Sequence, residues 1–148
     1  MRRMRMESVA LLLAGLLALA GCAQGGQRGE GCGGEADNPH VSKGYLSQFG
    51  QKVVVGKTRF GCEGVSRLEL AVYVERLVNG SWRVIADNPE SYSNPVSGKE
   101  YVLQASTTSC VKGTYRTRVQ LRKIVLTSGK AASIQKPYDY SQTVTISC

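Results

Sequence analysis

The sequence has 148 residues, and its 19 Lys or Arg against 11 Asp or Glu give a formal net charge of +8. This length suits one domain with a single core and leaves no room for a second domain. The positive excess is moderate, so a solvated basic surface explains it before a polyanionic partner is invoked.

The N-terminal segment has the parts of a secretory signal. Arg2, Arg3 and Arg5 precede an uninterrupted run of apolar and small residues from Val9 to Ala20. A spanning helix needs roughly 20 apolar residues, so this run is too short to cross a bilayer and is interpreted as a leader. No second run of this kind follows, and we expect no membrane-spanning segment after residue 22.

The leader ends at Leu19-Ala20-Gly21-Cys22, which resembles the lipobox of bacterial lipoproteins. The resemblance implies that residues 1–21 are removed and that Cys22 carries a diacylglyceryl group, which anchors the chain to the outer face of the bacterial cell membrane. Ordinary secretion is the alternative, with cleavage after Ala20 and release of a soluble product. The leader takes three arginines and one glutamate with it, so the mature chain has sixteen Lys or Arg against ten Asp or Glu, a formal net charge of +6.

Residues 22–37 are predicted to be the lipidated cysteine and a flexible linker, and residues 38–148 the folded domain. Six of the fourteen residues from 23 to 36 are glycine and none is large and apolar, a composition typical of linkers. The run Gly29 to Gly34 superficially resembles a phosphate-binding loop. We assign it no such role, because the sequence predicts neither a strand before it nor a helix after it.

Beyond the linker the chain is rich in β-branched and aromatic residues, and its two clearest strands alternate with a period of two. The first, 67–78, places Leu68, Leu70, Val72 and Val74 on one face and Glu69, Tyr73 and Glu75 on the other. The second, 113–126, places Tyr115, Val119, Leu121 and Val125 inward and Arg116, Arg118, Gln120 and Arg122 outward.

Turn signals complete the pattern. Asn79-Gly80 predicts a type I′ hairpin turn that returns the chain through a strand at 81–86, and residues 87–99, with two Asn-Pro steps, are expected to form a loop. Further strands are expected at 41–47, 52–60, 101–107 and 143–148. Seven short strands predict an all-β domain, an immunoglobulin- or fibronectin-like two-sheet β-sandwich.

Lipidation of Cys22 leaves four cysteines, which can form two disulfides in an oxidising compartment: Cys32, Cys62, Cys110 and Cys148. A hairpin of 41–47 and 51–60 brings the first two together, and pairing of 114–126 with 141–148 brings the last two together. We therefore predict Cys32–Cys62 and Cys110–Cys148, although four cysteines allow two other connectivities. The core-spanning disulfide beside a tryptophan that marks immunoglobulin domains is not matched, so the architecture alone is predicted.

The sequence offers little for catalysis or cofactor binding. His40 is the one histidine, and it lies beside the linker, where a nucleophile and a base are difficult to hold within hydrogen-bond reach. Zinc sites need clustered Cys and His, whereas these cysteines are widely spread and include no CxxC pair. We expect no enzyme activity, no metal and no cofactor, although spacing alone does not exclude paired carboxylates.

Three arginines form the first candidate binding group. Arg116, Arg118 and Arg122 project from one face of one strand, a stripe suited to teichoic acid, lipid headgroups or another polyanion. We favour a structural interpretation, because the neighbouring strand offers Glu69 and Glu75 as partners. Nucleic acid is disfavoured by export and by the lack of basic residues interleaved with exposed aromatic ones.

The second candidate group is Tyr138, Asp139 and Tyr140, flanked by Lys130 and Lys136. Its composition is typical of a recognition loop, because tyrosine gives contact area at low entropic cost. We expect it at the end of the sandwich where residues 62–65 and 127–140 meet. The other interpretation is a turn whose tyrosines fold back on the sandwich edge.

Together these features favour a non-catalytic, lipid-anchored surface module that binds a protein or cell-envelope partner. The alternative is a passive envelope-associated lipoprotein whose basic face rests on anionic polymer. Salt separates the two, because a charge-driven association weakens with ionic strength and a tyrosine-centred one does not.

Overall fold

The computed structural model describes residues 26–148. The leader and the predicted lipid site at Cys22 lie outside the described residues.

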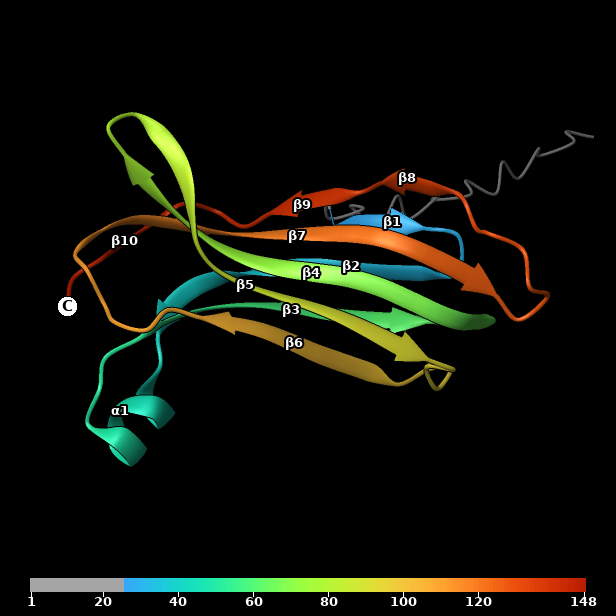
Figure 1. Ribbon diagram of the computed structural model, residues 1–148, viewed down its shortest axis with the longest axis horizontal. Coiled ribbons are helices and arrows are strands. Elements are labelled where there is room, and N and C mark those ends of the chain that lie inside the picture. The colour runs from blue at the N-terminus through green and yellow to red at the C-terminus, as the bar shows by residue number, and fades with distance from the viewer. Residues whose placement is uncertain (1–25) are drawn as a thin grey trace, which may run out of the picture.

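Residues 26–148 form two β-sheets packed face to face (Figure 1). Sheet A has the order β6 (Glu100–Ser106), β3 (Val54–Cys62), β2 (Cys32–Val41), β1 (Gln27–Gly29) and β8 (Ile134–Lys136). Sheet B has the order β5 (Ser81–Ser93), β4 (Val65–Val78), β7 (Gly113–Leu126) and β10 (Val144–Ile146), and β9 (Tyr138–Tyr140) also pairs with β7.

The strand order is that of an immunoglobulin-like sandwich. In sheet A, β2, β3 and β6 take the places of strands A, B and E, and in sheet B, β4, β7 and β10 take those of C, F and G. Within residues 26–148, neighbouring strands pair antiparallel in both sheets. The prediction of an all-β, two-sheet sandwich with two disulfides is confirmed.

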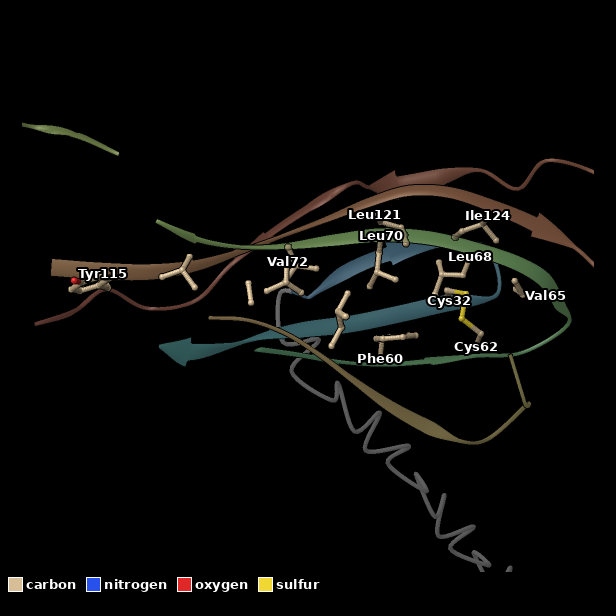
Figure 2. Packing of buried hydrophobic residues seen from close by; sticks show 14 of the residues in the cluster. Cys32, Phe60, Cys62, Val65, Leu68, Leu70, Val72, Tyr115, Leu121 and Ile124 are labelled. Carbon is tan, nitrogen blue, oxygen red and sulfur yellow. A yellow bond between two sulfur atoms is a disulfide. The ribbon is translucent and has the colours of Figure 1, made fainter. Parts of the chain in front are cut away.

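The core lies between the sheets and follows the alternation predicted for β4. Leu68, Leu70, Val72 and Val74 are all fully buried. Figure 2 shows three of them, Leu68, Leu70 and Val72, between the sheets with Phe60 and the Cys32–Cys62 disulfide. Each buried side chain of this size stabilises the fold by roughly 1.5–3 kcal/mol.

The prediction that Val125 of β7 points inward is wrong. The ladder between β7 and β4 shifts register between Glu69 and Leu70 of β4, and Arg122 is the extra residue of the resulting β-bulge. The bulge moves the alternation along by one position. Ile124 is therefore buried, at 1% exposure, and Val125 is only half-buried.

The hairpin of β4 and β5 has the predicted turn but a longer second strand. Asn79 and Gly80 have φ values of 50° and 76°, as a type I′ turn requires. Strand β5 continues to Ser93, so the loop expected from residue 87 begins later. Pro89 is tolerated within β5 because this strand forms the edge of sheet B, where a missing N–H breaks no ladder bond.

The glycine-rich segment is not a linker beyond Gly26, since it supplies β1 and most of β2. Its glycines let the backbone approach the core closely. A Cβ on Gly29 would lie 2.4 Å from Cδ1 of Ile124, and one on Gly34 would lie 2.6 Å from the carbonyl oxygen of Arg59. The folded domain therefore begins well before residue 38.

The strand expected at 41–47 is instead a helix, α1 (Lys43–Phe49). The side chain of Ser42 caps it by accepting a hydrogen bond from the Tyr45 amide at 3.2 Å, and Gly50 ends it in the left-handed conformation. No residue of α1 is buried, and the rings of Tyr45 and Phe49 pack on each other, 4.7 Å apart. Within residues 26–148, no helix has the length and apolar character to cross a membrane.

Both predicted disulfides are present, Cys32–Cys62 and Cys110–Cys148. The first joins residues directly opposite each other on β2 and β3, so the strand that pairs with β3 is 32–41 and not 41–47. The sequence separations are 30 and 38. Loops of this length contribute about 3–4 kcal/mol each in the chain-entropy model.

Tyr115 makes a contact that is typical of immunoglobulin-like sandwiches. It lies at the start of β7 and is fully buried, and its hydroxyl donates to the carbonyl of Val111, four residues upstream. This is the tyrosine corner of immunoglobulin-like folds. It fixes the crossing from sheet A to sheet B.

Three aromatic rings close one side of the core, Phe60, Tyr92 and Tyr101, with centroids 5.1–5.5 Å apart. Burial raises the pKa of Tyr92 above its usual 10.0, and the negative charge of Glu90 and the neighbouring Tyr101 raise it further. The folded state therefore holds this proton more tightly than the unfolded chain.

We expect this raised pKa to contribute to alkaline unfolding. Stability linked to Tyr92 is complete below the unfolded pKa of about 10 and is lost as the pH rises through the higher folded value. In Tyr92→Phe the free energy of unfolding should fall less steeply with pH above about 10. Urea unfolding at a series of alkaline pH values measures both slopes, and parallel curves for the two chains would contradict the assignment.

Candidate functional site

Four of the six tentative binding residues come together on the outer face of sheet B. Strand β9 pairs with β7 so that Tyr140 lies opposite Arg118 and Tyr138 opposite Gln120. Arg116 and Arg118 point outward from β7, as the alternation predicts. Tyr138 and Tyr140 are 40% and 48% exposed, so both rings are available to a partner.

The arginines of this face are stacked between aromatic rings. The guanidinium carbon of Arg116 lies 4.3 Å from the ring centroid of Trp82 and 4.4 Å from that of Tyr140. That of Arg118 lies 3.9 Å from Tyr73 and 5.9 Å from Tyr138. We call these six residues the arginine–aromatic array: Tyr73, Trp82, Arg116, Arg118, Tyr138 and Tyr140. Such cation–π contacts contribute about 0.5–2 kcal/mol each and hold the guanidinium planes in place.

Glu75 lies under the array and binds both arginines. Nε of Arg116 donates to Oε2 at 2.7 Å, and Nε of Arg118 donates to Oε1 at 2.6 Å. The Glu75 side chain is only 7% exposed, and those of Arg116 and Arg118 are 22% and 17% exposed. One carboxylate between two guanidiniums leaves a local charge of +1.

The predicted pairing of the arginine stripe with β4 is therefore right for Glu75 and wrong for Glu69. Glu69 instead pairs with exposed Arg67, at 3.0 Å. Arg122, displaced by the bulge, is exposed farther along β7 and lines a shallow depression of about 300 Å³. It does not belong to the array.

Gln120 connects two of the array's three tyrosine hydroxyls. Its Oε1 accepts from the hydroxyl of Tyr73 at 3.0 Å, and its Nε2 donates to that of Tyr138 at 3.2 Å. These bonds fix the amide and orient Tyr138 beside Arg118. The exposed ring is thus held in a fixed position.

Asp139 lies apart from the array, because its side chain points between the sheets. It is 8% exposed, and its Oδ2 accepts from the backbone amide of Ala36 at 2.8 Å while Nζ of Lys136 lies 3.5 Å from Oδ1. The contact with Ala36 ties sheet B to sheet A. The recognition-loop prediction is wrong on this point, since Tyr138–Tyr140 form an edge strand.

The end of the sandwich where that loop was expected does form. The amide of Thr127 donates to the carbonyl of Gly64 at 2.9 Å, so the segments after β3 and after β7 meet there. The tyrosines, however, lie along the side of sheet B and not at this end. Their position agrees with the second interpretation, in which the tyrosines fold back on the sandwich edge. Both rings are nevertheless exposed.

Other parts of the described chain offer less. A larger depression, of about 730 Å³, is shallow and lies near the Cys32–Cys62 end of sheet A, where glycines alternate with charged residues of both signs. The side chain of His40 is exposed. Within residues 26–148 its one hydrogen-bond contact joins Nδ1 to the carbonyl oxygen of Asn38, at 3.4 Å. The same residues contain no cluster of three or more His, Cys, Asp or Glu suited to a metal.

Trp82 and the bridging role of Gln120 are the parts of the site that sequence reasoning missed. The signal was present in the hairpin, because a two-residue turn at Asn79-Gly80 fixes Trp82 opposite Leu77. Leu77 is two residues from Glu75 on β4, so Trp82 lies on the same face of sheet B as Glu75. Comparison with protein-family models, with curated proteins and with solved structures finds no match.

We expect Glu75 to be the main structural support of the array. Glu75→Ala leaves two guanidiniums side by side without their carboxylate, which should lower the free energy of unfolding by about 3 kcal/mol, the lower end for a broken buried pair. Glu69→Ala is the matched control on the same strand, and loss of its exposed pair should cost less than about 1 kcal/mol. Urea unfolding compares the two, and equal losses would contradict the central role of Glu75.

Proposed function

We propose that this chain is a non-catalytic binding module, anchored by lipid on Cys22 to the outer face of the bacterial cell membrane, which holds a protein or cell-envelope partner on the arginine–aromatic array. The observation that carries the proposal is the pair of exposed rings, Tyr138 and Tyr140, packed beside Arg116 and Arg118. Aromatic and arginine side chains are the residues that most often dominate binding energy.

Preorganisation favours a binding role for this surface. An interface loses about 0.5–1.5 kcal/mol for each flexible side chain that it immobilises. In the array, stacking and the bonds to Glu75 and Gln120 have already ordered the side chains. A partner therefore meets a fixed pattern of rings and N–H donors.

The passive alternative, a basic face resting on anionic polymer, has less support. Glu75 neutralises one of the two array charges, which weakens a purely electrostatic attraction. Contact through exposed rings should persist at high salt, whereas attraction between exposed charges is screened beyond about 8–10 Å.

The cysteine count supports the anchor. The two disulfides use four of the five cysteines in the sequence, which leaves Cys22 for the lipid. Disulfides also suit an exported chain, because they persist in oxidising compartments.

The anchor is tested by mass spectrometry of the mature chain isolated from its membrane fraction. We expect a chain that begins at Cys22 and carries the additional mass of a diacylglyceryl group, and we expect Cys22→Ala to abolish both. The double variant Cys110→Ala, Cys148→Ala is the control and should keep the lipid. An unmodified, soluble wild-type chain that begins at Gly21 would indicate ordinary secretion instead.

Binding is tested by capture of envelope proteins and polymers on the lipidated mature chain in detergent, at low and at high salt. A double change Tyr138→Ser, Tyr140→Ser should weaken capture by about 30-fold, as expected for a hot spot of 2 kcal/mol. Tyr45→Ser is the control, because Tyr45 is 39% exposed on α1, away from the array. A loss of stability with unchanged capture would show that the tyrosines are structural.

A further inference from the structure

The position of Gly26 limits how the domain sits on its anchor. Gly26 packs against β2, since a Cβ there would lie 3.2 Å from Cγ of Glu35. Only residues 23–25 separate it from Cys22. A chain spans at most about 3.6 Å per residue, so Cys22 lies within about 14 Å of Gly26.

The same side of the sandwich carries β9. Glu35 is followed by Ala36, whose amide bonds Asp139 at 2.8 Å, and Tyr138 and Tyr140 flank that aspartate. Figure 1 shows β1, β8 and β9 along one long side of the molecule and α1 on the opposite side. A lipid on Cys22 therefore holds the β9 side close to the bilayer and leaves α1 on the far side.

From this arrangement we propose that the partner of the array is the membrane itself: Tyr138, Tyr140 and the two arginines rest on the phosphate headgroups of anionic phospholipids in the anchoring bilayer. This inference rests on the proposed lipid anchor at Cys22. It identifies the surface that the proposed function leaves open.

The chemistry of the array fits a phosphate-rich surface. Each guanidinium carries five N–H donors, and its bond to Glu75 uses one of them. The remaining planar donors match phosphate oxygens. Tyrosine, with an apolar ring and a polar hydroxyl, is enriched where hydrocarbon meets headgroups.

Charge acts in the same direction at longer range. The mature chain has a formal net charge of +6, sixteen Lys or Arg against ten Asp or Glu, and the array itself keeps one uncompensated positive charge. Anionic lipids attract basic residues near the surface within about a Debye length. With Cys22 at most about 14 Å from Gly26, the anchored domain can lie on the surface, where these charges act.

Trp82 makes the proposal measurable, because it is the one tryptophan in the sequence and stacks on Arg116 in the array. The lipidated mature chain is reconstituted into vesicles of phosphatidylcholine, with or without phosphatidylglycerol. Quenching of Trp82 fluorescence by aqueous acrylamide is then compared. We expect clear protection in the anionic vesicles and little in the zwitterionic ones.

Two changes should move this protection in opposite directions. Glu35→Gln, an exposed position beside Gly26 and outside the array, adds one net positive charge on the anchored side, so the ratio of protected to accessible Trp82 in anionic vesicles should rise about fivefold. Tyr138→Ser with Tyr140→Ser should lower protection toward the zwitterionic value. Tyr45→Ser, on the far side, should leave it unchanged, and near-UV circular dichroism confirms that each variant is folded.

The outcomes separate this inference from the proposed function. Equal quenching of the lipidated wild-type chain in both vesicle types would overturn the headgroup contact, and the anchor and a protein partner would then still stand. Protection of Trp82 only on addition of a captured envelope protein would also overturn it in favour of that partner. A mature chain without lipid would remove the anchor and the inference together.

Discussion

A single buried carboxylate organises the outer face of sheet B. Glu75 binds the Nε atoms of Arg116 and Arg118 at 2.7 and 2.6 Å. Because each Nε is held, each guanidinium plane is held as well, and the rings above and below can stack on it. Without the carboxylate, two like charges from neighbouring outward positions of one strand would repel each other and separate. The order of the array thus depends on an acid that is itself almost completely buried.

The C-terminal segment decides where this face lies relative to the rest of the molecule. It pairs first with sheet A as β8 and then with sheet B as β9 and β10. Between β8 and β9, Lys136 reaches Asp139, and Asp139 accepts the Ala36 amide across the sandwich. This bond places the exposed tyrosines beside β2, the strand that pairs with β1. The exposed tyrosines and the first described residues of the chain therefore share one side of the fold.

The sequence predicted the features that follow from alternating apolar residues. It did not predict those that depend on how closely the backbone approaches the core. Leu68, Leu70, Val72 and Val74 are buried as their period of two requires, and the turn at Asn79-Gly80 is as expected. The bulge at Arg122 is invisible in the pattern and moved burial from Val125 to Ile124. The glycines of β1 and β2 carry no apolar signal, because their contribution is the absence of a Cβ next to core atoms. For the site, the tyrosines and arginines were recognised, but their meeting depends on the pairing of β9 with β7.

Strand β9 reverses the usual pattern, with an acid inside and aromatic rings outside. A one-residue slip against β7 would exchange the two faces, burying Tyr138 and Tyr140 and exposing Asp139. Burial of two tyrosines favours that slip through the hydrophobic effect. The observed register is instead supported by polar bonds, from Ala36 and Lys136 to Asp139 and from Gln120 to Tyr138. Directional bonds therefore hold two aromatic rings at the surface, against the hydrophobic preference for burying them.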